Sequence, residues 1–466
     1  MIEVIFKRWE SIFIKLQKLQ NPPRFTPNML LKLLVPLMIE QLLAVTVGMA
    51  DTMMVARVGE AAVSGISLVD QINVLLIQVF AALATGGAVV ASQYIGRNDR
   101  TNARVAAKQL LYSTLGIAII LAVVVLLCNK YLLLLVFGNV EPAVMQAAET
   151  YFWLSAVSYP FLALYNAGAA LFRSMGNSKV SLFASLWMNV INIGGNAILI
   201  FGFGWGVAGA AFATLISRAF AGIFMIVLLH NRSNPIYLEH IWHPALHKKM
   251  LLNILRVGVP SGVESGMFQF GKLLVAGLIA SFGTTALAAN AVCNGLGSLS
   301  NMPGAAIGLG MITVIGQCVG GRDFEQARYY ARKLMIVSYL VMAATNLLIF
   351  FSAPFLVDIY HMSAATSELS VFVLRYYCIL CIIAWPMSFV MPNVLRAAGD
   401  AKFTMVVSMV SMWLCRVVMA YVLGAWLSWG LFGVWVAMTM DWVVRGAVFL
   451  VRYSSDKWLK QNLLDR

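Results

Sequence analysis

The chain has 466 residues, of which 61% are hydrophobic and only 11% are charged, and this composition excludes an ordinary soluble globular protein. Its formal net charge is +14, a value that by itself suggests nucleic-acid binding. The bases lie between long apolar runs, so we expect membrane topology and anionic lipids, and no nucleic acid, to explain the charge. The six cysteines lie within or at the ends of those runs, which favours reduced thiols over a disulfide framework.

The apolar runs predict an all-α membrane protein. Residues 1–29 alternate apolar side chains with Lys and Arg too often to span a bilayer, which predicts an interfacial amphipathic segment. About 20 apolar residues cross the hydrocarbon core, and lipid offers backbone groups no outside partner, so each run of that length should be a helix. Twelve such transmembrane helices are predicted, near residues 30–55, 62–95, 102–127, 143–172, 179–201, 206–230, 254–282, 286–318, 326–352, 366–395, 403–424 and 430–452.

Lys and Arg are distributed unevenly between the two sides of these helices. If the N-terminus is cytoplasmic, 27 of the 33 bases fall in cytoplasmic segments. The outer segments hold Arg57, Lys130 and Arg375, while Arg218, Lys272 and Arg416 lie within helices. The positive-inside rule therefore predicts that both termini are cytoplasmic in a multi-pass protein of the cell (inner) membrane.

The two halves of the chain repeat one another. A shift of 224 positions places Pro36 on Pro260 and Glu40 on Glu264, and further matches include Gly59 on Gly283, Gln93 on Gln317, Asp99 on Asp323 and Trp205 on Trp429. Each repeat holds six helices, an even number, so the repeats share one orientation and their interface should carry the substrate path. The predicted divisions are 1–29 (interfacial segment), 30–230 (N-terminal lobe), 231–253 (cytoplasmic loop), 254–452 (C-terminal lobe) and 453–466 (cytoplasmic tail).

Five stretches resemble a known transporter family. They are Glu40-Gln41-Leu42, Asp51-Thr52-Met53-Met54-Val55, Gln93-Tyr94-Ile95-Gly96, Leu171 to Asn177, and Gly206 to Ala211. Together with their echoes in the second half, these stretches are similar to the multidrug and toxic compound extrusion (MATE) transporters. The resemblance implies twelve helices in two lobes and the export of organic, often cationic amphipathic compounds against an inward flow of Na⁺ or H⁺.

Four polar residues of the N-terminal lobe form a candidate cation site. Asp51 lies within the first helix, where an acid is costly, and its repeat equivalent is Val275, so the shared scaffold does not require it. Asn192 and Asn196 stand four apart on one helical face, and Thr214 lies at a similar depth on the next helix. Carboxylate, amide and hydroxyl oxygens suit Na⁺, whereas a proton needs only the carboxylate, so Na⁺ is the preferred coupling ion. The alternative is that the three neutral residues only hydrogen-bond between helices.

The MATE resemblance supports that site and leaves coupling through the C-terminal lobe in doubt. MATE proteins place a helix 1 Asp, two helix 5 residues four apart and a helix 6 Thr around a cation. Some relatives have Asp where Asn196 stands, so here we expect one titrating group in place of two. Some branches also carry acids in helices 7 and 10, where this chain has Met267-Phe268-Gln269 and Trp385-Pro386-Met387.

The C-terminal lobe offers a weaker candidate for substrate binding. Glu264 is mirrored by Glu40, and Asp70 by Asn294, which favours gating or packing roles for both acids. Lys272 and Arg416 either pair with acids such as Glu264 or Asp441, or line a cavity and favour a negatively charged substrate. The candidate cavity residues are Glu264, Phe268, Gln269, Lys272, Trp385, Met387 and Arg416.

Other functional classes find less support. The sequence has no His-Glu-x-x-His motif and no Gly-x4-Gly-Lys-Ser/Thr loop, so we expect neither an enzyme nor a nucleotide-driven pump, and no cofactor beyond the coupling ion. Histidines 230, 240, 243 and 247 are read as a solvated loop in preference to a metal site. A flippase or exporter of a lipid-linked or anionic metabolite remains the alternative function. Small-molecule substrates and membrane lipids are the expected partners of a monomeric chain.

Overall fold

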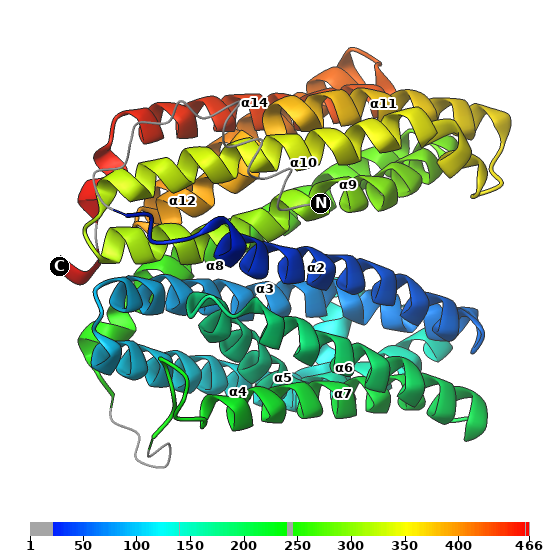
Figure 1. Cartoon of the computed structure of the whole chain (residues 1–466). Coiled ribbons are helices and arrows are strands. Elements are labelled where there is room, and N and C mark those ends of the chain that lie inside the picture. The colour runs from blue at the N-terminus through cyan, green and yellow to red at the C-terminus, as the bar shows by residue number, and fades with distance from the viewer. Residues whose placement is uncertain (1–21, 139, 240–245, 462, 466) are drawn as a thin grey trace. The chain divides into compact units, whose positions relative to one another are not determined.

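The computed structural model describes residues 22–138, 140–239, 246–461 and 463–465, and this part of the chain contains helices and no strand (Figure 1). The predicted interfacial segment therefore lies largely outside the described residues. The first half contains α2 (Pro27–Ala56), α3 (Glu60–Gly96), α4 (Arg100–Phe137), α5 (Pro142–Ser174), α6 (Ser178–Asn196), the π-helix η1 (Ala197–Gly202) and α7 (Gly206–Leu229).

The second half repeats this order. It contains α8 (Lys248–Ser281), α9 (Thr284–Gly320), α10 (Phe324–Asp358), α11 (Ala364–Trp385), the π-helix η2 (Pro386–Val390), α12 (Met391–Ala397), α13 (Ala401–Ser411), the π-helices η3 (Met412–Val418) and η4 (Tyr421–Trp426), and α14 (Gly430–Ser454). Two short 3₁₀ turns, η5 (Lys457–Gln461) and η6 (Leu463–Asp465), follow.

The predicted membrane-spanning helices are present. Among the described residues, eleven helices are long and apolar enough to cross a membrane, counting each helix together with the π-segment that continues it. The remaining predicted segment, 143–172, is α5. It is 33 residues long but more polar, because Ser, Tyr, Pro and Asn residues interrupt its apolar run. It packs against α3, α4 and α7, so neighbouring helices cover much of its polar surface.

The helices form two compact units. Among the described residues, the N-terminal unit lies between positions 42 and 262, and the C-terminal unit comprises residues 22–41 together with those from position 263 onward. Figure 1 shows α3 to α7 packed side by side within the N-terminal unit. The start of α2 belongs to the C-terminal unit because Phe25 exchanges two hydrogen bonds with the Tyr330 hydroxyl, at 2.9 and 2.8 Å. This division cuts α2 and α8, whereas the predicted boundary lies in the 231–253 loop.

The internal repeat is visible in the backbone. The π-helix η1 spans residues 197–202 and η4 spans 421–426, so the two lie 224 positions apart. Gly209 lies against the backbone of Leu199, and Gly433 lies in the same way against Leu423. Because a β-carbon at either glycine would fall within 3.1 Å of these backbone atoms, the close approach of the fifth and sixth helices of each repeat requires glycine.

Two of the duplicated turns carry N-cap hydrogen bonds and two do not. Asp99 and Asp323 each accept a hydrogen bond from a backbone N–H of the following helix, donated by Asn102 and Gln326 respectively, as N-cap residues do. Asn177 and Asp400 occupy N-cap positions but make no such bond. Asp400 instead accepts from Arg452 Nε at 2.8 Å, because an arginine on α14 offers a stronger, charged donor.

Candidate cation and substrate sites

The four predicted cation-site residues come together within the N-terminal unit. Asp51 lies on the last part of α2, and Asn196 Nδ2 on α6 donates to Asp51 Oδ1 at 2.8 Å. One helical turn earlier, the Asn192 amide lies between Asp51 and Thr214 of α7, at 3.2 Å from Thr214 Oγ1. Asn192 and Asn196 are 6% and 2% exposed. Residues separated by up to 163 positions therefore form one polar cluster.

The Asn192 amide can present either of its ends to Asp51. With its nitrogen toward the carboxylate it donates to Asp51 Oδ1 and Oδ2 at 2.7 and 3.0 Å, while its oxygen accepts from Thr214 Oγ1. In the opposite orientation the amide oxygen faces the carboxylate oxygens. Two acceptors at that separation repel one another unless a proton or cation lies between them. The amide can thus satisfy the carboxylate alone or join it as a ligand.

Asn196 provides a further oxygen beside Asp51. Its Oδ1 is buried and accepts no hydrogen bond from the described residues. The π-helix η1 begins at the next residue, and such π-segments are found often at functional sites. An unsatisfied amide oxygen next to a carboxylate is a suitable additional ligand for a hard cation.

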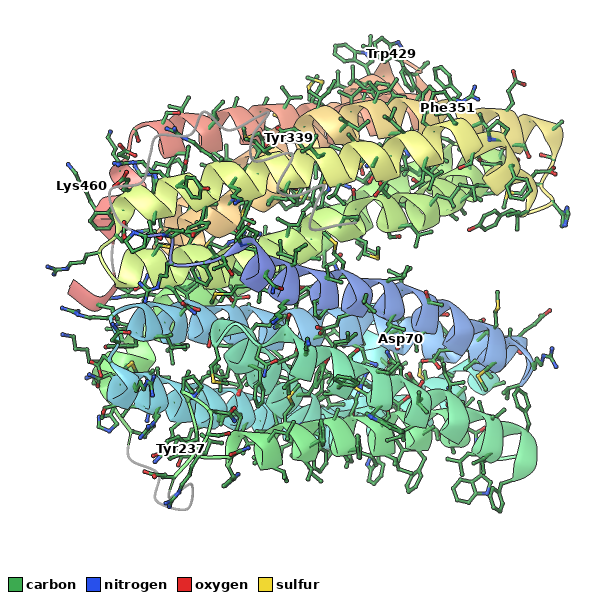
Figure 2. The ribbon with its side chains drawn as sticks, in the orientation of Figure 1. Asp70, Tyr237, Tyr339, Phe351, Trp429 and Lys460 are labelled. Atoms are coloured by element: carbon green, nitrogen blue, oxygen red, sulfur yellow. The ribbon has the colours of Figure 1, made fainter. Side chains whose placement is uncertain are left out.

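The surrounding cavity holds two more charged residues. It has a volume of about 260 Å³ and is lined by Asp51, Asn192, Asn196 and Thr214 together with Asp70 and Arg218. Asp70, which the sequence assigned to gating or packing, therefore shares the cavity with Asp51. It lies on α3 and is labelled in Figure 2. The cavity contains two carboxylates and one guanidinium, where the sequence indicated a single titrating group.

A hydrogen-bonded network supports these charges. Asn73, one turn beyond Asp70 on α3, donates to Asp70 Oδ1 at 3.3 Å and accepts from the Tyr159 hydroxyl at 2.7 Å. Arg218 donates to Ser158 Oγ at 2.8 Å. Because Ser158 and Tyr159 are adjacent on α5, this central helix holds both Asp70 and Arg218 in place.

A second, larger cavity lies in the C-terminal unit. It has a volume of about 570 Å³ and is lined by α8, α9, α11, η2, η3 and α14. Four of the seven predicted cavity residues line it, namely Phe268, Lys272, Trp385 and Arg416. Glu264, Gln269 and Met387 do not. Met387 packs against Gly446, and Glu264 pairs with Arg396 at 2.6 Å.

The acids proposed as partners for Lys272 and Arg416 are engaged elsewhere. Glu264 forms an ion pair with Arg396, as described above. Asp441 accepts from Ser411 Oγ at 2.5 Å and pairs with Arg445 at 3.4 Å. The alternative in which Glu264 or Asp441 forms a direct ion pair with Lys272 or Arg416 is therefore wrong for the described residues, because other bases lie closer to both acids.

The cysteines and the loop histidines are the side chains most suited to disulfide or metal chemistry. All six cysteines are free thiols, and no group of three His, Cys, Asp or Glu residues that could hold a metal ion occurs within the described ranges. Two of the four loop histidines, at positions 240 and 243, lie outside those ranges.

Comparison with known proteins identifies the family. The MatE family profile matches residues 36–198 and 260–422, two ranges offset by the same 224 positions as the internal repeat. The chain belongs to the MATE family. A protein of Bacillus subtilis described as the uncharacterized transporter YisQ is 30% identical over 439 residues, covering 92% of this chain and 94% of YisQ. The probable multidrug resistance protein NorM of Thermotoga maritima is 26% identical, covering 94% of each chain.

Solved MATE structures share the fold. An outward-facing multidrug resistance transporter of the family superimposes with a TM-score of 0.87 at 20% identity, covering 93% of this chain and 96% of that chain. A MATE structure in a bent conformation gives a TM-score of 0.86 with the same coverage. The predicted two-lobed, all-α membrane fold is thereby confirmed for this MATE protein.

Sequence reasoning missed two residues of the N-terminal cavity in this MATE protein. The sequence does indicate a functional role for Asp70 and Arg218, since each is a charged residue within a predicted membrane helix. The match of Asp70 to the polar Asn294 favours a role shared by both repeats, which hides its place beside Asp51. For Arg218, helical periodicity does not specify which neighbouring helix the side chain contacts.

Proposed function

We propose that this MATE protein is a secondary active multidrug exporter in the cell membrane, driven by inward movement of a cation that binds at Asp51. The observation that carries the proposal is the Asp51 carboxylate with the Asn196 and Asn192 amides at 2.8 and 2.7 Å. The volume of the cavity is about 260 Å³. Pockets that bind drug-sized molecules are usually larger, with volumes of about 300–1,000 Å³. It therefore suits an ion better than an organic substrate.

Na⁺ is the proposed ion. Asn196 Oδ1 is an unpartnered buried oxygen, the Asn192 amide can turn its oxygen toward Asp51, and Thr214 Oγ1 lies next to Asn192. With the carboxylate these groups supply several hard oxygen ligands, as an alkali cation requires. A proton would use only one of them. Asp51, Asp70 and Arg218 together carry one net negative charge, which a single Na⁺ neutralises.

Ion binding would act through the helices that carry its ligands. A cation entering from outside would draw the end of α2 toward α6 and α7, because each contributes oxygen ligands. This rearrangement would favour the state that reloads substrate from the cytoplasm. Its energy is limited to the difference in the ion's affinity for the two states.

The first prediction tests Asp51 directly. In inverted membrane vesicles, Asp51→Asn should abolish export of a cationic dye driven by an Na⁺ gradient while leaving folded protein in the membrane, because the charged ligand is lost.

Asn196→Ala should weaken the dependence on Na⁺ more than it weakens dye binding. Asn166→Ala is the matched control, because Asn166 bonds only to the Leu162 carbonyl of its own helix among the described residues.

Two results would contradict the proposal. Wild-type transport rates in Asp51→Asn would remove the carboxylate from coupling. Transport that follows a pH gradient unchanged in Na⁺-free buffer, with no response to added Na⁺, would replace Na⁺ with H⁺ and leave Asp51 as a proton carrier.

A further inference from the structure

The larger cavity combines positive charge with aromatic walls. Lys272 projects from α8 and Arg416 from η3, and neither forms an ion pair with any described residue. No Asp or Glu occurs among the described residues that line the cavity. Two bases facing one cavity without a carboxylate is an unfavourable arrangement for an apolar protein interior. It becomes favourable when a ligand supplies the negative charge.

Arg416 is the more buried of the two bases. Its side chain is 9% exposed, and its Nε has no hydrogen-bond partner among the described residues. Its guanidinium carbon lies 5.0 Å from the centre of the Phe268 ring, so the ring supports one face of the guanidinium. A buried, unpaired N–H of a guanidinium costs free energy, and an acceptor on a bound ligand would recover it.

Nearby charges do not cancel this positive potential. Asp441 is the acid that interacts electrostatically with Arg416, but it also pairs with Arg445 and accepts a hydrogen bond from Ser411. Lys272, Arg416 and Arg445 are three bases against one acid, which leaves a net charge of +2 around the cavity. Lys272 is exposed within the cavity, so its ammonium group is accessible to a ligand.

The walls favour a flat aromatic ligand. Trp385 and Phe389 stack with ring centres 4.9 Å apart, and Phe389 meets the edge of Trp442 at 6.0 Å. The centre of the Tyr377 ring lies 5.2 Å from that of Trp435 and 5.5 Å from that of Trp442. Aromatic walls around a few polar groups, with a volume of about 570 Å³, match the pockets that bind drug-sized molecules.

We propose that this cavity binds flat aromatic organic anions. Their carboxylate lies between Lys272 and Arg416, and their rings contact the side chains of Trp385, Phe389 and Trp442. Binding of these anions does not depend on the proposed export function. Their export does, and it rests on that function. It extends the expected range of substrates beyond the cationic compounds suggested by the family resemblance. The compact volume favours a soluble anion over a lipid-linked precursor.

A matched pair of dyes tests the proposal. Fluorescein and rhodamine 123 share a xanthene ring system but carry opposite charge, and their binding to the full-length protein in phosphatidylcholine nanodiscs can be followed by fluorescence anisotropy. We expect Lys272→Gln and Arg416→Gln each to weaken fluorescein binding by about tenfold or more, because each removes a charged donor. Rhodamine 123 binding should not weaken in either variant. Lys272→Arg, which keeps the charge, should retain fluorescein binding.

The controls separate this proposal from ion coupling. Arg375→Gln removes an arginine of α11 that lines neither cavity described above, and it should leave fluorescein binding unchanged. Fluorescein binding is measured in Na⁺-free buffer without a gradient, so it does not depend on ion coupling through Asp51. Failure of Asp51→Asn to affect transport would therefore contradict the proposed coupling and not the anion cavity.

Three outcomes would overturn the anion cavity. One is the absence of fluorescein binding beyond that of empty nanodiscs. Another is an affinity that neither Lys272→Gln nor Arg416→Gln alters. The third is displacement of fluorescein by phosphatidylglycerol added to the nanodiscs, with transport assays showing lipid movement and no fluorescein export, which would assign the cavity to a lipid headgroup.

Discussion

Asp51, Asp70 and Arg218 share one cavity, so its affinity for a cation depends on three charged side chains. Asp51 contacts the amides directly, while Asp70 and Arg218 are held by the α3 and α5 network. Asp70 and Arg218 therefore act at longer range, through the electrostatic potential, and their effects on Na⁺ should have opposite signs.

The second prediction follows from those signs. Asp70→Asn removes a negative charge and should raise the Na⁺ concentration needed for half-maximal transport, whereas Arg218→Gln removes a positive charge and should lower it. Each shift should be about three- to tenfold, because solvent partly screens charges at the exposed Asp70. Ser67→Ala, an uncharged change in the same cavity, should shift the value by less than about twofold. Shifts of the same sign for both charge variants would contradict this electrostatic account.

At the scale of elements, the cation cluster depends on how closely α5 and α7 approach. Gly222 on α7 lies against the backbone of Phe161 on α5, where an added β-carbon would be 2.5 Å from the Phe161 carbonyl oxygen. Backbone atoms cannot move aside as a flexible side chain can. Since Thr214 lies two turns earlier on α7, separating these helices would also displace the cluster.

The third prediction is that Gly222→Ala destabilises the protein by about 1–3 kcal/mol through overpacking. The measurement is the Tm of purified protein with and without Na⁺, and the variant should show both a lower Tm and a smaller stabilisation by Na⁺. Gly116→Ala on α4 meets no atom within 4 Å and should leave the Tm unchanged or slightly raised. Equal Tm values for the two variants would show that α5 and α7 can separate without cost.

The distribution of bases along the chain predicts an orientation of the protein in the membrane. The outer segments hold three of the 33 Lys and Arg residues. Aromatic side chains mark the same ends of the helices. Trp205 and Trp429, which are repeat equivalents, are 51% and 50% exposed, and Figure 2 shows Trp429 at the edge of its unit. Exposed tryptophans of this kind suit a membrane–water interface.

The fourth prediction concerns that orientation. A green fluorescent protein fused to the C-terminus should fluoresce, and alkaline phosphatase fused there should be inactive, because the tail is expected in the cytoplasm. Phosphatase fused in the loop after Phe137 should be active. Active phosphatase at the C-terminus would reverse the assigned topology and place the entry side of the Asp51 site in the cytoplasm.

Features that depend on local chemistry could be predicted from the amino-acid sequence. Long apolar runs specify membrane helices because lipid cannot satisfy an exposed backbone. The repeat was readable because duplicated turns keep their residues. The Asn192 and Asn196 pair was predictable because a spacing of four places both on one helical face. Asp51 was identified because an acid in an apolar run is costly.

The pairing of charged side chains from different helices could not be predicted from the sequence and depends on the packed fold. Glu264 pairs with Arg396, 132 positions away, and leaves Lys272 and Arg416 to face the cavity. Asp70 shares a cavity with Asp51, although 19 positions and a turn separate them in sequence. Helical periodicity specifies the face on which a residue lies, but the rotation of each helix about its axis is set by packing against several neighbours at once. The partners of long charged side chains therefore depend on how the helices pack. The sequence of a single helix does not specify that packing.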